Sequence, residues 1–286
     1  MTVAPGLVIV DKGGGMTSHD VVARVRRLAG TRKVGHAGTL DPMATGVLVL
    51  GLDRATRLLG HLMLTDKAYD ATVRLGVATT TDDAEGEVIA TASTASVTEQ
   101  RVREALELFV GDIEQVPSAV SAIKVDGKRA YDRVRAGEQV ELKPRTVRVD
   151  SIEVHEVDGD DVRISVRCSS GTYIRAIARD LGEHLGVGGH LVALRRTAVG
   201  PYAVEAAHTL EQLEDELAVL PIAEAARSAF PSLDLDAEQA TDVGFGRKLA
   251  LDLGHAGPVA LFGPAGDFLA LYAQEGESAR AVAVFV

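Results

Sequence analysis

The stretch GHAGTLDPMATG at positions 35–46, followed by the apolar run VLVL at 47–50, decides how the rest of the chain is read. Asp41 stands in the middle of this glycine-rich loop, directly before Pro42. Because proline disfavours the helical region for the residue before it, we expect Asp41 in extended or turn backbone. The apolar run is typical of a strand buried on both faces, although a buried helical segment has the same pattern. The sequence thus predicts one acid on a loop anchored by a core element, a common place for catalytic groups.

Length and composition limit the class of protein. The chain has 286 residues, enough for two domains, and its 46% hydrophobic content supports a substantial core. Its one cysteine, Cys168, permits no internal disulfide, which fits a reducing cytoplasm. The sequence shows no secretory signal and no apolar run near the ~18 residues of a membrane span. We therefore expect a cytoplasmic protein that does not associate with membranes.

The net charge of −11 is unevenly distributed. Residues 1–201 hold 26 Lys and Arg against 27 Asp and Glu, whereas residues 202–286 hold 4 against 14. The acidity of the last part leaves room for basic patches on the first. Basic residues interleaved with Tyr131 gather over residues 111–148, a composition that suits an arm lying along an RNA backbone. Because acidic residues dilute this charge, an ordinary charged surface hairpin and helix is an equally open interpretation.

Hydrophobic periodicity predicts both helices and strands. Alternation predicts strands at 67–76, where Tyr69 begins the core-facing row, and at 162–168. Ser18 is a plausible N-cap for the first helix. Further expected elements are a strand at 7–10, helices at 18–29, 54–65, 97–110, 174–185 and 209–226, and short C-terminal strands at 259–262, 268–272 and 282–285. These last runs are typical of a small β-barrel or sandwich.

Four motifs together carry a family resemblance. GHAGTLDPMATGVL at 35–48 is accompanied by Asp11-Lys12, by Lys67-Ala68-Tyr69 and by Gly171-Thr172-Tyr173-Ile174-Arg175. In this order they resemble the bacterial tRNA pseudouridine-55 synthase (TruB) family, over residues 7–202. The resemblance implies an α+β fold, with a mixed or antiparallel sheet flanked by helices as in pseudouridine synthases. It also implies three parts of the chain: a catalytic domain at 1–229, an RNA-gripping insertion at about 112–148, and a small all-β PUA-like domain at 230–286.

The same resemblance assigns catalytic roles to Asp41, Tyr69 and Arg175. It implies that Asp41 is the essential carboxylate and that Arg175 keeps it ionised and oriented, since an opposite charge within ~4–6 Å lowers a carboxylate pKa. Asp41 would attack C1′ of the uridine or abstract its 2′ proton, and the sequence leaves both routes open. Tyr69 would lie against the uracil ring, where its hydroxyl or a water helps to remove the C5 proton.

Other residues are implied to bind the substrate. His36 would occupy space around the extruded nucleotide, Leu194 would pack on the base opposite Tyr69, and Lys12 would support the site. Departures from the family pattern are Gly13, where a proline is usual, and the lack of a tyrosine before Ser121. The complete set of predicted substrate-binding residues is His36, Lys12, Tyr173, Leu194, Lys124, Lys128 and Arg129.

No cofactor or metal is expected, because the eight histidines lack metal-ligand spacing and the reaction needs neither oxidation nor an energy source. The partner implied by the family is the T-arm stem-loop of tRNA; no protein partner is implied, and we expect a monomer. Three alternatives stay open: a synthase acting on another RNA, a non-catalytic tRNA-binding or chaperone module, and a nucleoside or glycoside hydrolase. The hydrolase is disfavoured because no second carboxylate is paired with Asp41.

Overall fold

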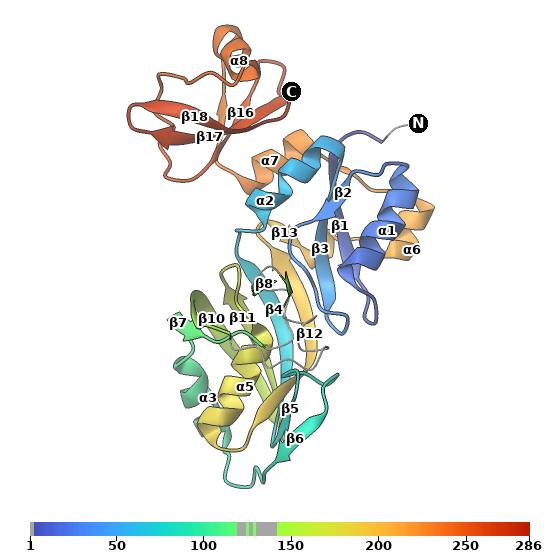
Figure 1. Cartoon of the computed structure of the whole chain (residues 1–286), viewed down its shortest axis with the longest axis vertical. Coiled ribbons are helices and arrows are strands. Elements are labelled where there is room, and N and C mark those ends of the chain that lie inside the picture. The colour runs from blue at the N-terminus through green and yellow to red at the C-terminus, as the bar shows by residue number, and fades with distance from the viewer. Residues whose placement is uncertain (1–2, 119–123, 126–127, 130–141) are drawn as a thin grey trace. The chain divides into compact units, whose positions relative to one another are not determined.

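The computed structural model describes residues 3–118, 124–125, 128–129 and 142–286. The chain divides into two compact units (Figure 1). The first unit comprises Met1–Pro42, Gly46–Met63 and Val199–Val286, and the second comprises Met43–Thr45 and Leu64–Ala198. The predicted domain boundary between residues 229 and 230 does not coincide with a boundary between these two units, and it stays a prediction.

The first unit is built around an antiparallel strand pair. β1 (Gly6–Lys12) pairs with β3 (Thr45–Leu52), and this register places Lys12 opposite Gly46. β3 also pairs with β2 (Val34–His36), so the loop that carries Asp41 connects two neighbouring strands. The apolar run after the loop is therefore a strand, and not the helical segment that its pattern also allowed.

Helices and short strands complete the first unit. They are α1 (Ser18–Ala29), the 3₁₀ helix η1 (Asp53–Arg57), α2 (Leu59–Leu62), β13 (Tyr202–Ala203), η2 (Val204–Ala206), α6 (Leu210–Asp215), β14 (Leu220–Pro221) and α7 (Ile222–Ala229). Apolar side chains of β1, β3, α2 and α7 form a continuous buried core with side chains of the C-terminal strands.

The predicted small C-terminal β domain is confirmed, and it also contains a helix. Its four-stranded sheet has the order β15-β16-β17-β18, and Figure 1 labels the last three of these strands. The elements are β15 (Ser232–Asp234), α8 (Ala237–Gly244), β16 (Val259–Phe262), β17 (Phe268–Glu275) and β18 (Ser278–Val284). Phe285 belongs to the shared core of the unit, and the Arg54 Nη1 donates to its carbonyl oxygen at 2.9 Å.

The second unit is a mostly antiparallel sheet in the order β12-β4-β11-β10-β7. The register of β4 against β11 places Tyr69 opposite Val166 and Asp70 opposite Ser165. The elements are β4 (Lys67–Leu75), β5 (Val77–Thr79), β6 (Val88–Thr91), α3 (Glu99–Glu107), β7 (Gly111–Gln115), β8 (Lys124–Val125), β9 (Lys128–Arg129), β10 (Arg145–Asp158), β11 (Asp161–Cys168), α5 (Ile174–Leu185) and β12 (Gly189–Val199).

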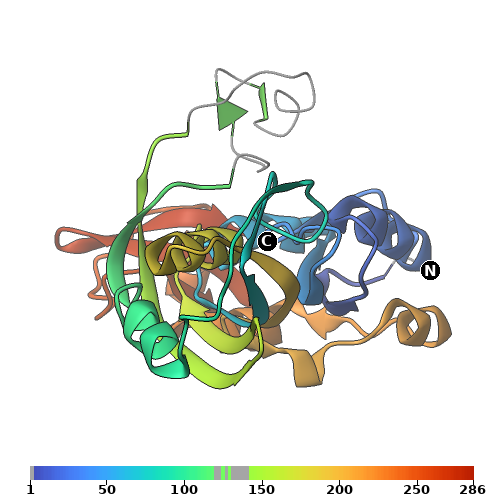
Figure 2. The same ribbon diagram turned by 90° about the horizontal axis from the view of Figure 1, so that it is seen from below.

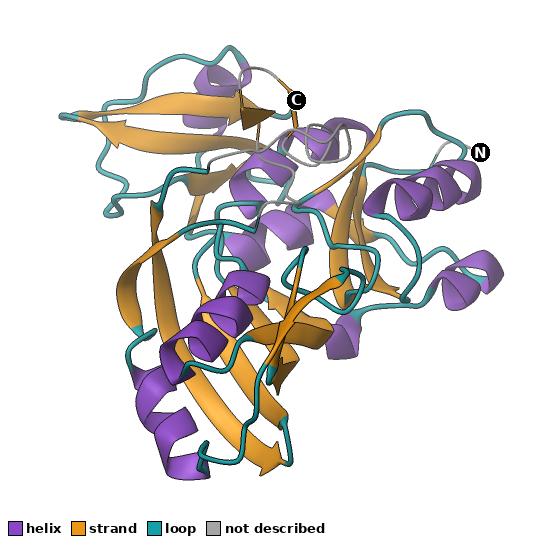
Figure 3. Cartoon of the chain, turned by 60° about the horizontal axis from the view of Figure 1, so that its bottom comes forward, coloured by secondary structure: helices purple, strands orange, loops and turns teal. Residues whose placement is uncertain are grey.

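Helices α3 and α5 cover one face of this sheet (Figures 2 and 3). Their apolar sides pack with the inward row of β4 and β11 into a second core, which includes Tyr69 and Cys168. The alternation predicted for both strands is thus confirmed, because successive side chains of a strand point to opposite faces. Gly182 on α5 lies so close to Gly188 that a Cβ there would sit 2.1 Å from the Gly188 carbonyl carbon. The helix therefore meets the start of β12 backbone to backbone.

Two predicted helices are wrong. Residues 54–65 form the 3₁₀ helix η1 and the four-residue α2 instead of one helix. The chain turns so tightly after β3 that a Cβ on Gly51 would lie 2.9 Å from the Ala55 carbonyl oxygen. Residues 209–226 form α6 and α7 with β14 between them; α6 ends at Asp215, and Pro221 disfavours helical backbone at Leu220 before it.

Candidate active site

The loop that carries Asp41 is fastened on both sides of the carboxylate. Ser18 Oγ donates to the Leu40 carbonyl at 3.2 Å and accepts from the Leu40 N–H at 2.9 Å. On the other side, the Pro42 carbonyl accepts from the Gly15 N–H at 2.9 Å. Asp41 itself is half-buried. Its two neighbours are therefore fixed while its own side chain keeps access to solvent.

Lys12 is the central support of this loop. Its side chain is completely buried, and its Nζ donates to the carbonyls of Gly13, Met16 and Pro42 at 2.9, 2.8 and 3.2 Å. An ammonium group with three donors is well matched to three converging carbonyl oxygens. The placement of Lys12 therefore favours support of the loop, which the sequence also predicted, over direct contact with a substrate.

The start of helix α1 explains why Ser18 is available for the loop. The helix is capped by Thr17, not by Ser18 as predicted, and Thr17 forms a capping box with Asp20. Ser18 is buried and serves the loop instead. His36, at the end of β2, is half-buried and stacks edge-on against His19 with ring centroids 5.8 Å apart.

Tyr69 and Leu194 lie on neighbouring strands of the second unit. Tyr69 is 9% exposed and belongs to the buried cluster under α5, and Leu194 on β12 packs against the same cluster. Lys67 precedes Tyr69 on the same face of β4. Burial, followed by the charge of Arg196, lowers the pKa of Lys67 to about 8. This end of the sheet thus combines an aromatic ring, an aliphatic side chain and two buried cationic residues.

Arg175 takes part in a buried ion pair that the sequence did not predict. Its Nη1 lies 3.3 Å from Asp83 Oδ2, and both side chains are 5% exposed. The same nitrogen donates to the Thr81 carbonyl at 2.9 Å. Asp83 Oδ1 in turn accepts from Thr81 Oγ1 at 2.5 Å and from the Glu85 N–H at 3.1 Å. The turn between β5 and β6 therefore fixes the position of the Arg175 guanidinium.

Arg179, one helical turn after Arg175, forms a second link to the same turn. Its Nη1 lies 3.1 Å from Asp82 Oδ2, and Asp82 has a left-handed backbone with φ of 61°. Arg179 also pairs with Asp180, whose pKa is raised by burial against the opposing effect of the arginine. Both arginines of this helix are therefore held by the turn between β5 and β6.

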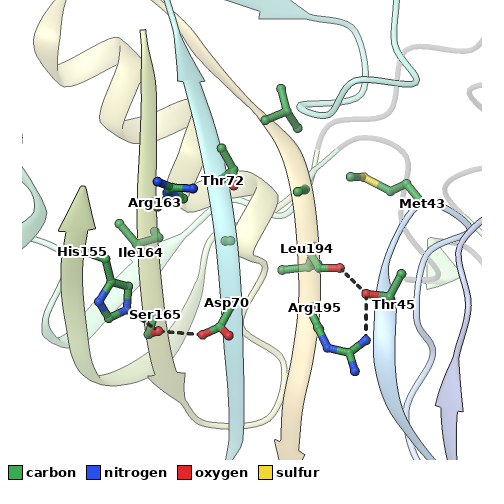
Figure 4. Close-up of a pocket in the computed structure, with 13 residues that line it drawn as sticks. Met43, Thr45, Asp70, Thr72, His155, Arg163, Ile164, Ser165, Leu194 and Arg195 are labelled. Carbon is green, nitrogen blue, oxygen red and sulfur yellow. Dashed lines mark hydrogen bonds between the residues drawn. The ribbon is translucent and has the colours of Figure 1, made fainter. Parts of the chain in front are cut away.

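A cavity of about 620 Å³ opens beside Asp70, Ser165 and Leu194 (Figure 4). Asp70 lies on its wall, where it accepts from Ser165 Oγ at 2.6 Å. Ser165 Oγ lies 2.7 Å from His155 Nε2, and Thr45 Oγ1 lies 3.5 Å from the Leu194 carbonyl oxygen. Leu194 lines this cavity, whereas Tyr69 and Arg175 do not. The cavity is thus distinct from the side of the sheet that carries the predicted catalytic residues.

The predicted site residues are divided between the two units. Lys12, His36 and Asp41 lie in the first, and the second holds Tyr69, Tyr173, Arg175 and Leu194. The predicted proximity of Asp41 and Arg175 involves one residue from each unit, and it stays a prediction. Of the insertion, β8 and β9 pair with Lys124 opposite Arg129 and Val125 opposite Lys128. The predicted Tyr131 lies outside the described residues.

Sequence reasoning missed Asp83, and only a weak signal was present. Asp83 stands in the polar run Thr79–Gly86, and nothing in a single sequence separates a buried aspartate from its exposed neighbours. Among the described residues, no group of three or more His, Cys, Asp or Glu is placed to hold a metal ion. In the same part of the chain, no helix combines the length and the apolar character that crossing a membrane requires.

Comparison with known proteins identifies the family. Residues 26–174 match the N-terminal domain model of the TruB family pseudouridylate synthases. Residues 175–229 match the model of a tRNA pseudouridylate synthase B C-terminal domain, and residues 230–286 match the C-terminal model of tRNA pseudouridine synthase II.

Curated relatives match over nearly the whole chain. A protein named tRNA pseudouridine synthase B from Thermobifida fusca is 57% identical, over 99% of this chain and 99% of its own length. One of the same name from an Arthrobacter species is 56% identical, over 98% and 96%.

Solved structures show the same fold. In the structure of a Cbf5-Nop10-Gar1 complex, a chain 28% identical matches with a TM-score of 0.76, over 98% of this chain and 85% of that one. A chain in the structure of an H/ACA RNP bound to a substrate RNA containing 2′-deoxyuridine matches with a TM-score of 0.75, at 27% identity and the same coverage. The chain therefore belongs to the TruB family of pseudouridylate synthases and is an isomerase.

Proposed function

We propose that this protein converts the T-loop uridine of tRNA, uridine-55, to pseudouridine, with Asp41 as the essential carboxylate. The relatives named tRNA pseudouridine synthase B support tRNA as the substrate. The observation that carries the role of Asp41 is the fastening of its loop by Ser18, Lys12 and Gly15. A carboxylate that acts on a sugar carbon needs a fixed position, since reacting atoms must be held about 3–3.5 Å apart.

The proposed reaction is an isomerisation, so the substrate and the product have the same atomic composition. The bond between N1 and C1′ of the uridine breaks, the base turns, and a bond forms between C1′ and C5. The proton on C5 leaves, and N1 gains one. Asp41 acts either by adding to C1′ or by abstracting the 2′ proton, and both routes require its ionised form. Enzymes that act on a base take it out of the helical stack, so the uridine must be extruded.

Other residues are assigned supporting roles in this proposal. Arg175 orients the Asp41 carboxylate, and Tyr69 lies against the uracil, where its hydroxyl or a water receives the C5 proton. Leu194 packs on the base, and His36 occupies space around the extruded nucleotide. Tyr173 contacts the substrate from the start of α5. The basic residues Lys124, Lys128 and Arg129 contact phosphates of the T-arm, which is recognised mainly through its shape and backbone.

Tritium release from C5 tests the proposal. A T-arm stem-loop with uridine tritiated at C5 is incubated with the protein without added cofactor, and release is expected to be stoichiometric. Asp41→Asn should release nothing above background while its affinity for the RNA is largely kept. Asp161→Asn, which alters a surface ion pair, is the matched control and should behave as the wild type.

Three results would contradict parts of the proposal. Release that is unaffected by Asp41→Asn would remove this residue from the mechanism. Binding without any release by the wild type would favour a non-catalytic tRNA-binding module. Equal release from a stem-loop whose tritiated uridine lies outside position 55 would favour a synthase that acts on other RNA sites.

A further inference from the structure

Strand β7 ends where the basic segment leaves the sheet, and its last residue is Gln115. The register pairs Gln115 with Arg145, the first residue of β10. The segment between these two strands contains Lys124, Lys128 and Arg129. Gln115 is therefore the final paired residue of β7 before the part of the chain to which we assign RNA contacts.

The side chain of Gln115 makes two hydrogen bonds to the backbone at the start of helix α5. It is 1% exposed, its Nε2 donates to the Tyr173 carbonyl at 3.1 Å, and its Oε1 accepts from the Tyr173 N–H at 2.8 Å. Tyr173 is the N-cap residue of α5 and makes no capping bond with its own side chain. A buried amide that is satisfied on both sides fixes its partner in one position. Arg175 follows Tyr173 by two residues.

Arg179 makes a second connection between the same places. Its Nη2 donates to the carbonyl of Val116, the residue after Gln115, at 2.8 Å. Its Nη1 lies 3.1 Å from Asp82 Oδ2, and its Nε donates to Asp180 Oδ1 at 2.8 Å. Asp82 is adjacent to Asp83, which pairs with Arg175. Arg179 thus links the end of β7 to the turn that holds the Arg175 guanidinium.

We propose that Gln115 and Arg179 are positioning residues that lock helix α5, and with it the Arg175 guanidinium, to the end of β7. The inference rests on the proposed function, because the contacts of Gln115 and Arg179 are given a role in orienting Arg175 for catalysis. Neither residue touches the reacting atoms in this account. Each acts through Arg175, Gln115 through the backbone of Tyr173 and Arg179 through Asp82.

The test separates positioning from folding. Gln115→Met removes both hydrogen bonds at similar size and should lower the single-turnover rate constant of tritium release about tenfold or more, as expected for loss of two buried hydrogen bonds. The dissociation constant for the T-arm stem-loop should change less than about twofold, since a buried residue does not contact RNA. Amide hydrogen exchange at residues 174–177 should speed up about tenfold.

Matched controls come from helix α3. Arg103→Met removes an arginine that, like Arg179, pairs with a carboxylate and donates to a backbone carbonyl, that of Val154. Gln100→Met removes an exposed glutamine bonded to Glu104. Both controls should retain the wild-type rate constant and the wild-type exchange of α5.

Arg179 gives an independent arm if Gln115→Met fails to fold. Arg179→Met should lower the rate constant with an unchanged dissociation constant, and Arg179→Lys should recover part of the loss because lysine keeps one donor group. Wild-type rate constants and wild-type α5 exchange in the folded Gln115 and Arg179 variants would overturn the inference. If the wild type itself released no tritium, the proposed function would fail. Hydrogen exchange alone would then still decide whether Gln115 and Arg179 hold α5 at the end of β7.

Discussion

The buried pair between Arg175 and Asp83 has a surface counterpart in the same unit, and the comparison isolates the effect of burial. Arg175 Nη1 lies 3.3 Å from Asp83 Oδ2, with both side chains 5% exposed. Arg74 binds Asp161 through two hydrogen bonds of 2.7 Å, but these side chains are 47% and 33% exposed. By geometry alone, the surface pair would be the stronger of the two.

Burial reverses that order. Asp83→Asn removes one charge of a desolvated pair, which typically costs about 3–5 kcal/mol. The lower end applies, about 3 kcal/mol, because asparagine keeps an oxygen that accepts from Thr81 Oγ1 and the Glu85 N–H. Asp161→Asn should cost about 0–1 kcal/mol, since solvent screens exposed pairs. At ~2–4 °C per kcal/mol, the expected fall in Tm is about 6–12 °C for Asp83→Asn.

Two assays check this prediction. Urea unfolding at neutral pH gives the free energy of unfolding for the wild type and both variants. Single-turnover tritium release, measured well below each Tm, should fall about tenfold or more for Asp83→Asn, because the Arg175 guanidinium loses its fixed position. Asp161→Asn should keep the wild-type rate constant. Equal losses of stability in the two variants, or an unchanged rate constant for Asp83→Asn, would refute the argument from burial.

Three further predictions concern buried polar groups. Lys12→Met leaves three carbonyls without their ammonium donor and should lower the free energy of unfolding by about 2–4 kcal/mol. Lys33→Met, at an exposed position, should change it by less than about 0.5 kcal/mol. Urea unfolding of both variants measures the two values, and equal effects would contradict the prediction. Burial lowers the pKa of Lys67 from 10.5 to about 8 in the folded protein. Below pH about 8 the folded protein therefore keeps a buried charge, which lowers its free energy of unfolding. Between pH about 8 and 10.5 the folded state loses this proton before the unfolded state does, so the free energy of unfolding should rise with pH. Lys67→Met should flatten that rise by about 3 kcal/mol in unfolding curves recorded across this range, and a parallel pH dependence in both proteins would exclude Lys67 as its source. Burial raises the pKa of Cys168 to about 11, so iodoacetamide at pH 8 should modify it only in urea, and modification in native buffer detected by mass spectrometry would show that the thiol is accessible.

Local elements with a strong residue pattern could be predicted from the sequence alone. Alternation predicted β4 and β11 within a residue of their observed ends, because a half-buried strand must place every second side chain in the core. The loop that carries Asp41 and the apolar strand after it were also predicted correctly. Two helix predictions failed: η1 and α2 replace one helix, because the chain turns tightly after β3, and α6 and α7 with β14 between them replace the other.

Which polar residues hold the site depends on how distant parts of the chain pack together. Asp83 and Gln115 look like ordinary surface residues in the sequence, and the sequence does not show that Lys12 is buried, yet all three are nearly or completely buried. Their partners are distant along the chain: Gln115 and Tyr173 are separated by 58 positions, and Lys12 and Pro42 by 30. The physical reason is that periodicity records which face of one element is apolar, whereas a buried hydrogen bond or ion pair depends on where two different elements meet.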